Sequence, residues 1–306
     1  MRPLLWSSLA SVLLTATLPA QTKTTAQRLG YPANAKLLIL HADDLAVAHS
    51  VNVASLDALT TGAVSSASIM VPTPWLTEVA AYAKAHPNAD LGLHLTVTAE
   101  WETYRWGSVE SKDKVPTLLD RDGTFPRQTS VVSARASIPE VERELRAQIE
   151  RALEVGIRPT HVDSHMGTLF STPALMAAYI KVAREYGLPF LAVKTGYRTV
   201  PPSLAKDDIV LDTLISAGGD TPRDKWNQFY LDAIANLKPG LSEILVHLGH
   251  DGEELQAVMV DHEPFGAAWR QRDYDVVRSA EFKKALKDNN VILVTWREIQ
   301  KLIQKP

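Results

Sequence analysis

The chain has 306 residues, with 32 Lys and Arg against 35 Asp and Glu, and a formal net charge of −3. A charge this close to zero gives no bulk attraction to nucleic acid or to an anionic membrane, so we expect neither as a partner. The sequence contains no cysteine, which excludes disulfides, thiolate nucleophiles and cysteine metal sites. Any metal must therefore be held by oxygen and imidazole ligands.

The first segment, MRPLLWSSLASVLLTATLPAQT, is typical of a secretory signal peptide. It has one Arg, an apolar run over residues 4–18, and small residues before a cleavage site that we expect near Ala20. The alternative is an uncleaved membrane anchor, for which the run is short and rich in Ser and Thr. We therefore predict that residues 1–22 are a signal peptide and that residues 23–306 form a single domain. The mature protein would then be exported, to the periplasm or the medium, without contact with a membrane.

From Lys36 onward, short apolar runs alternate with helical patterns. The runs that predict strands are LLIL (37–40), VSSASIMV (64–71), LGLHLTV (91–97), PTHVDS (159–164), FLAVK (190–194), DIVLDTL (208–214), EILVHL (243–248) and VILVTW (291–296). The clearest helical patterns cover residues 51–62, 76–86, 138–156 and 173–187. This alternation predicts a parallel sheet with helices outside it. About eight such units predict an irregular (β/α) TIM-like barrel, with a doubly wound open sheet as the alternative.

Two connections between these units are long. Residues 99–137 and residues 249–277 contain none of the predicted elements listed above. Connections of this length inside a compact domain are usually functional. The alternative is that they are surface excursions that only cover the barrel.

Histidine and aspartate recur directly after predicted strands. In a parallel α/β fold the active site lies beyond the carboxyl ends of the strands. The first, third, fourth and seventh predicted strands end in such residues: His41, Asp43 and Asp44; His94; Asp163 and His165; and His247. We therefore expect these side chains to gather at one end of the fold.

This residue set suggests a metal centre. One Asp with two His is a common ligand set for a divalent ion that keeps open positions for water and substrate. In the adjacent pair Asp43 and Asp44, one carboxylate can then bind the metal while the other acts as a base. The alternatives are structural: a single His at a strand end is often only hydrogen-bonded, and an Asp pair can cap a helix, although Ser50 is the better-placed cap.

Five stretches together resemble the YdjC-like carbohydrate deacetylases. They are ILHADDLAVAHSVNVASLDALTTGAVSSASIMVP, LGLHLTVT, PTHVDSHMGTLF, EILVHLGH and WRQRDYDVVRSAEFKKALKDNNVILVTWREI, in family order between residues 36 and 299. The resemblance implies an irregular (β/α) barrel and a hydrolase that uses one divalent metal ion, Zn or Mg, to remove acetyl groups from N-acetylated sugars or oligosaccharides. Carried over by motif, it assigns six residues: Asp44, His94 and His165 as metal ligands, Asp43 as catalytic base by further analogy with the more distant NodB-type deacetylases, His247 as general acid, and Arg270 as the C-terminal arginine of the site.

The sequence departs from the family pattern at several positions. His41 replaces an Asn, Met166 and Thr168 stand where the family has further histidines, and Leu248 follows His247 in place of a proline. These departures bear on substrate identity more than on the metal ligands.

Aromatic residues in the two long connections suggest a sugar-binding surface. Trp101, Tyr104, Trp106 and Trp269 can stack on sugar rings or, alternatively, pack the connections onto the barrel. Two other functions remain open: hydrolysis of a different bond, such as a phosphoester or a non-sugar amide, and carbohydrate binding without turnover. A phosphate substrate would call for several converging cations, whereas only Lys194 ends a predicted strand. The sequence leaves the oligomeric state and the substrate length open.

Overall fold

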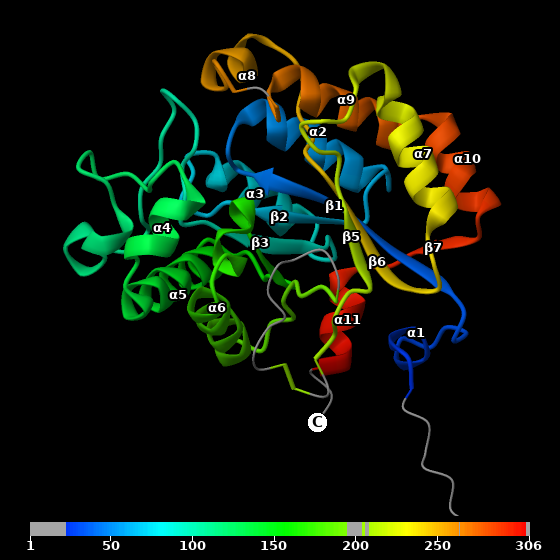
Figure 1. Ribbon diagram of the computed structural model, residues 1–306, viewed down its shortest axis with the longest axis horizontal. Helices are drawn as coiled ribbons and strands as arrows, with labels where there is room; N and C mark the ends of the chain where they lie inside the picture. Colours follow the sequence, from blue (N-terminus) through cyan, green and yellow to red (C-terminus); the bar gives the residue numbers. More distant parts are fainter. Residues whose placement is uncertain (1–22, 195–203, 206–207, 263, 304–306) are drawn as a thin grey trace, which may run out of the picture.

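The computed structural model describes residues 23–194, 204–205, 208–262 and 264–303 (Figure 1). The predicted signal peptide, residues 1–22, lies outside the described residues. In the described part of the chain, no helix is both long enough and apolar enough to cross a bilayer.

One parallel sheet of seven strands forms the centre of the fold. The strands are β1 (Lys36–Leu45), β2 (Ser66–Ile69), β3 (Leu91–Leu95), β4 (Val162–Ser164), β5 (Thr213–Ile215), β6 (Gly240–Val246) and β7 (Val291–Leu293). They lie in the order β4-β3-β2-β1-β6-β5, and β7 pairs with the first residues of β1. This is the cyclic strand order of a barrel that is opened between β4 and β5.

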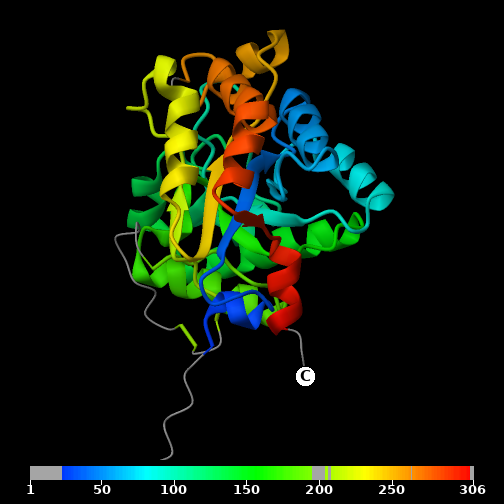
Figure 2. The same ribbon diagram turned by 90° about the vertical axis from the view of Figure 1, so that its right-hand side faces the viewer.

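Helices surround the sheet (Figures 1 and 2). They are α1 (Thr25–Arg28), α2 (His49–Thr60), α3 (Leu76–Ala85), α4 (Thr129–Arg135), α5 (Ile138–Glu154), α6 (Pro173–Glu185), α7 (Trp226–Asn236), α8 (Glu253–Val258), α9 (Ala267–Arg278), α10 (Ala280–Asp288) and α11 (Trp296–Ile303). Neighbours in this layer pack in pairs, α5 on α6, α2 on α9 and α7 on α10. Short 3₁₀ turns, among them η3 (His165–Phe170), connect some of the elements.

The fold confirms the expected parallel α/β sheet and corrects two local expectations. The predicted strand at 190–194 makes only isolated parallel bridges, Val162 with Phe190 and Val193 with Leu211, so the described residues form a half-barrel sheet, and its closure into a full irregular barrel stays a prediction. The connection predicted at 249–277 contains α8 and α9. The sequence pattern did not predict α9, because this helix buries charged residues together with apolar ones and so lacks a clear apolar face.

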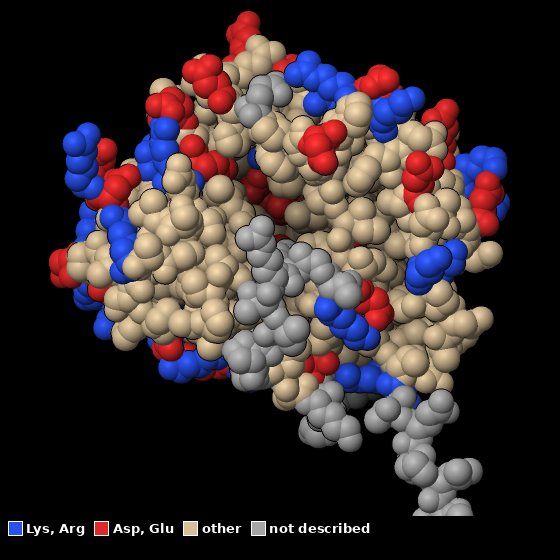
Figure 3. Space-filling view, viewed as in Figure 1, with Lys and Arg blue, Asp and Glu red and all other residues tan. Residues whose placement is uncertain are grey.

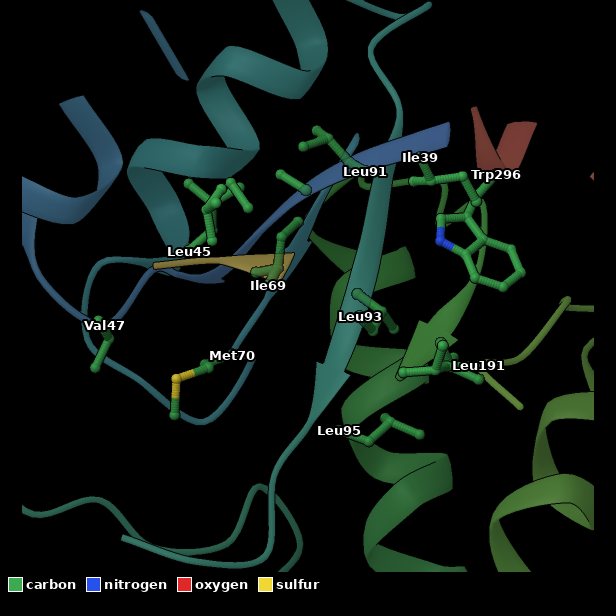
Figure 4. Packing of buried hydrophobic residues seen from close by; sticks show 14 of the residues in the cluster. Ile39, Leu45, Val47, Ile69, Met70, Leu91, Leu93, Leu95, Leu191 and Trp296 are labelled. Atoms are coloured by element: carbon green, nitrogen blue, oxygen red, sulfur yellow. The ribbon is translucent and has the colours of Figure 1, made fainter. Parts of the chain in front are cut away.

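Apolar side chains of the central strands form the core. Leu37 to Leu40 of β1 are at most 1% exposed, because a parallel strand covered on both faces must be apolar on both. Figure 4 shows Ile39 of β1, Ile69 of β2 and Leu93 of β3 among the packed residues, with Trp296 of α11 nearby. Burying a side chain of this size contributes about 1.5–3 kcal/mol each, which fixes the strands that carry the polar residues at their ends.

Candidate active site

The end of β1 turns two adjacent carboxylates into one cavity. Pairing between β1 and β2 becomes irregular between Ala42 and Leu45, and Asp44 and Ala46 have positive φ angles of 62° and 77°. Such angles are uncommon outside glycine and cost about 1–3 kcal/mol each. Asn52 of α2 holds this turn, because its side-chain oxygen accepts the N–H of Ala46 at 2.7 Å. The strained turn explains how consecutive residues, which would point to opposite faces of a regular strand, both line the cavity.

Asp44, His94 and His165 bring three candidate ligand atoms together. Asp44 Oδ1 lies 3.4 Å from Nε2 of His94 and 3.3 Å from Nδ1 of His165. All three residues are at most 4% exposed, and their ligand atoms lie within 4.8 Å of one another. Asp44 Oδ1 is buried without a hydrogen-bond partner among the described residues. A buried carboxylate oxygen in this state, next to two imidazole nitrogens, has the donor set and the unmet valence that suit a divalent cation.

Two further carboxylates orient the imidazoles. Asp163 Oδ1 lies 2.7 Å from Nδ1 of His94, and Glu100 Oε2 lies 2.9 Å from Nε2 of His165. Each contact occupies the ring nitrogen that faces away from Asp44, which is how proteins fix the tautomer of a metal-binding histidine. Burial alone would lower the pKa of His165, but its contacts with Glu100 and Asp44 raise it to about 10. A metal at Nδ1 would displace that proton.

Arg270, 1% exposed on α9, holds Asp44 in its charged form. Its guanidinium donates to Asp44 Oδ2 at 2.7 Å and to the carbonyl of Phe265 at 3.2 Å. Burial opposes ionisation of Asp44, but Arg270, with His165 and His94, keeps the pKa of Asp44 well below its usual range. Burial and the neighbouring charge of Asp44 instead raise the pKa of Asp43 well above its usual range. The two carboxylates thus have different environments, and Asp43 is the one that accepts a proton more readily.

His247 lies on the other side of Asp43. Its Nε2 is 3.4 Å from Asp43 Oδ2, and its backbone N–H donates to Asp273 Oδ2 at 2.9 Å. Asp273 also accepts hydrogen bonds from Tyr230 and Trp226 of α7, which fixes the end of β6. Burial lowers the pKa of His247 to about 3, so this imidazole is neutral near pH 7 before a substrate binds.

The cavity above these groups has a volume of about 600 Å³ and two kinds of surface. Its ionisable floor is formed by Asp43, Asp44, His94, His165, His247 and Arg270. Its apolar wall is formed by Met166, Leu191, Leu214, Ala217, Leu245 and Phe265. Figure 3 shows acidic side chains at the bottom of a hollow whose rim is largely uncharged. A cavity of this size and composition is typical of a small-molecule site.

The three tryptophans predicted to bind substrate lie behind this lining. Trp101, Trp106 and Trp269 are 1%, 4% and 4% exposed and are not among the residues that line the cavity. The guanidinium carbon of Arg270 lies over the ring of Trp101, 5.9 Å from the ring centroid. The rings of Trp269 and Phe265 pack together with their centroids 4.4 Å apart. Their positions fit the alternative of packing, and we expect them to support the site without touching substrate.

Several residues of the site were not assigned from the sequence. Glu100, Asp273 and Phe265 carried no recognisable signal, because each acts through a partner distant in sequence or through the shape of a loop. Asp163 was recognised as a strand-end residue, but its contact with His94 joins residues 69 positions apart. The sequence signal for this site was the recurrence of His and Asp directly after four of the predicted strands.

Comparison with known proteins shows which family the chain belongs to. The model of the family described as YdjC-like protein matches residues 37–288. The chain belongs to the YdjC-like family. Among its relatives, the carbohydrate deacetylase of Thermus thermophilus is 30% identical over 90% of this chain and 98% of its own length. The carbohydrate deacetylase of Thermoanaerobacter pseudethanolicus is 26% identical over 85% of this chain and 98% of its own.

A solved structure supports the fold of this YdjC-like protein. It is a crystal structure from Enterococcus faecalis whose description names a candidate cellobiose-phosphate cleavage protein. It superposes with a TM-score of 0.73 at 24% identity and covers 87% of this chain and 99% of the other. At this identity the likeness establishes the shared α/β fold with its half-barrel of parallel strands.

Proposed function

We propose that this protein is a divalent-metal-dependent hydrolase that removes N-acetyl groups from acetylated sugars or oligosaccharides. Membership in the YdjC-like family supports the proposal, as do relatives named carbohydrate deacetylases that align over nearly their whole length. The observation that carries it is the buried Asp44 Oδ1, which lies 3.4 Å from Nε2 of His94 and 3.3 Å from Nδ1 of His165, with a second carboxylate, Asp43, beside it.

Asp44, His94 and His165 would hold the ion. When bound, a divalent cation supplies Lewis acidity that polarises an amide carbonyl and acidifies water. One oxygen and two nitrogen ligands suit zinc, whereas magnesium usually takes more oxygen ligands. Arg270 keeps Asp44 ionised and in position through its 2.7 Å hydrogen bond, so we assign it to the support of a ligand rather than to the reacting atoms.

Asp43 and His247 would move the protons of the reaction. Asp43 would take a proton from the attacking water while the oxygen of that water forms a bond to the acetyl carbon. The C–N bond then breaks, and the leaving nitrogen must gain a proton. His247 Nε2 lies 3.4 Å from Asp43 Oδ2, so the proton that Asp43 has taken could pass through this imidazole, as the general acid, to the leaving nitrogen. The products are acetate and the free amino sugar.

The apolar wall would receive the less polar face of the sugar. Phe265 and Met166 present an aromatic ring and a thioether chain to the cavity, where a pyranose can place its C–H groups. The ionisable floor lies across the same cavity and would face the acetamido group.

The predicted signal peptide supports a location outside the cytoplasm. We propose that the enzyme is exported, to the periplasm or the medium, and acts there on sugars. Mass spectrometry of the mature protein should give an N-terminus near Gln21. A mature protein that retains Met1 would remove this part of the proposal.

The test is acetate release by the purified protein supplied with Zn²⁺ or Mg²⁺. N-acetylglucosamine and its short β-linked oligomers should release acetate, and the Asp43→Asn variant should release it ~10²–10⁴-fold more slowly. A non-sugar acetamide and a phosphomonoester serve as controls for other bonds. If the protein hydrolyses one of these controls but releases no acetate from the sugars, it is a hydrolase of another bond. Sugar binding without any turnover would make the protein a binding barrel.

A further inference from the structure

The interior of the half-barrel, beneath the ionisable floor, contains polar side chains that the proposed reaction does not use. Each is at most 4% exposed: His41, Ser66, Ser68, Asp90, His161, Asp163 and Glu243. Burying so many polar groups without hydrogen bonds would cost several kcal/mol, so their pairing must be nearly complete. His41, where the family pattern has an Asn, lies at the centre of this group.

His41 is held between two serines of β2. Its Nδ1 lies 3.1 Å from Oγ of Ser66, and its Nε2 lies 3.0 Å from Oγ of Ser68. Each serine continues to a carboxylate. Ser66 donates to Asp90 Oδ1 at 2.8 Å, and Ser68 donates to Asp163 Oδ2 at 2.9 Å.

The donors and acceptors in this chain can be counted. A serine hydroxyl has one hydrogen, and both serines give theirs to a carboxylate. Each serine therefore offers His41 only a lone pair, and both ring nitrogens of His41 must donate. An imidazole that donates from both nitrogens is an imidazolium. Its charge lies among buried acids, with Nε2 only 3.2 Å from Asp163 Oδ2.

One end of this chain reaches the candidate metal ligands. Asp163 uses Oδ2 for Ser68 and His41, and Oδ1 for Nδ1 of His94 at 2.7 Å. The position of Asp163 fixes the tautomer of His94 and aims its Nε2 at Asp44. We propose that His41 is a positioning residue that, as a doubly donating imidazolium, holds Asp163 directly and through Ser68 and so preorganises His94 to bind the metal.

A second metal site is the rival interpretation of the same residues. Ligand atoms of His41, His161 and Asp163 also lie within 4.8 Å of one another, and Nε2 of His161 has no hydrogen-bond partner among the described residues. A metal there would have to displace the contact of His41 with Ser68. His161 is instead accounted for by packing, since its ring stacks on Trp296 with centroids 4.9 Å apart. The positioning role thus predicts one metal ion per chain, and two would overturn it.

The two serines provide a matched pair of variants. Ser66 and Ser68 are both fully buried on β2, and both accept from His41, but only Ser68 lies on the path to His94. Zn²⁺ affinity of the full mature chain is measured by competition with a chelator for Ser66→Ala, Ser68→Ala and His41→Leu. Supporting groups of this kind typically change metal affinity by ~10–100-fold. We expect Ser68→Ala and His41→Leu to lose affinity by ~10-fold or more, and Ser66→Ala by less than about threefold.

Besides a second metal ion, two results for the variants and the metal-free protein would overturn the positioning role. One is equal Zn²⁺ affinity for Ser66→Ala and Ser68→Ala, which also decides the matter if His41→Leu does not fold. The other is a ¹⁵N NMR spectrum of the metal-free protein at neutral pH in which a His41 nitrogen lacks its proton. The proposal concerns the metal site of the proposed function, but the two fail separately. If the wild-type chain binds zinc tightly but releases no acetate, the proposed deacetylase activity is wrong. If it releases acetate but Ser66→Ala and Ser68→Ala bind zinc equally well, the positioning role of His41 is wrong. A wild-type chain that binds no zinc removes both.

Discussion

The ionisable floor and the apolar wall of the cavity differ in how the fold supports them. The floor lies at the ends of β1, β3, β4 and β6, where the strand ladder is continuous from β4 to β6. The imidazoles of His94 and His165 are held by hydrogen bonds to Asp163 and Glu100, and Asp273 accepts the backbone N–H of His247. Most of the wall lies outside the regular ladder: Leu214 is on the short edge strand β5, Met166 is in η3, and Leu191 and Phe265 are in connecting segments, whereas only Leu245 belongs to β6. The difference indicates that the fold holds the reacting groups rigidly and leaves the shape of the substrate pocket to less regular parts of the chain.

The largest expected effects come from the two adjacent carboxylates of the floor. Asp44→Asn should lose the metal, because a neutral amide is a much weaker ligand for a cation than a carboxylate. Asp43→Asn should keep the metal and lower kcat by ~10²–10⁴-fold, since only the proton acceptor is removed. Metal content measured beside kcat for both variants separates the roles. A metal-free Asp43→Asn together with a metal-loaded, active Asp44→Asn would reverse the assignment.

A smaller effect is expected behind the floor, at Glu100. Glu100→Gln keeps an acceptor for His165 but removes the charge that makes the imidazole a better ligand, so metal affinity should fall by ~10-fold. Glu102→Gln is the matched control, because Glu102 lies two positions away in an exposed ion pair with Arg127. Chelator competition measures both. Equal affinities for the two variants would show that Glu100 does not support the metal site.

On the apolar wall, we expect an effect on substrate binding alone. Met166 is 46% exposed and lines the cavity, and Met166→Ala removes a contact worth about 1 kcal/mol, so KM should rise about fivefold with kcat and metal content unchanged. Val260→Ala is the control, since Val260 is 41% exposed and is not among the residues lining the cavity. Steady-state kinetics with an acetylated sugar distinguish them. A fall in metal content for Met166→Ala would contradict the separation of wall and floor.

The smallest effect on catalysis is expected at Glu144 of α5, which anchors the connection that carries Glu100. Glu144 accepts the N–H groups of Val109 and Glu110 at 3.0 Å, and burial raises its pKa to about 7. Between its unfolded value of 4.5 and about 7, the folded chain keeps a proton that the unfolded chain releases. The contribution of Glu144 to the free energy of unfolding therefore falls as pH rises, by at most about 1.4 kcal/mol per pH unit, and is constant above that window.

Glu144→Gln cannot titrate and isolates this contribution. The difference in unfolding free energy between wild type and Glu144→Gln, measured by denaturant titration, should change between pH 5 and pH 7 in favour of the variant. A difference that stays constant with pH would mean that Glu144 remains ionised throughout, held by its hydrogen bonds.

More of the floor than of the wall could be predicted from the sequence, for physical reasons. Amphipathic spacing and a following glycine gave α5 and α6 almost to the residue, and the buried run of β1 placed His41, Asp43 and Asp44 at a strand end. The segment at 190–194 has the same apolar composition as a strand but pairs only at isolated bridges, which composition does not reveal. Glu100, Asp273 and Ser68 act through contacts between distant positions, and Phe265 lies in a loop with a positive φ of 69°, so no local pattern marks them.

The most direct test of the account is a crystal structure of the zinc-loaded protein with anomalous data collected at the zinc edge. The account predicts a single anomalous peak in the floor of the cavity, ~2.0–2.2 Å from Asp44 Oδ1, His94 Nε2 and His165 Nδ1, with Asp43 close by but not a ligand. A peak among His41, His161 and Asp163, or one bound by Asp43 in place of Asp44, would contradict it.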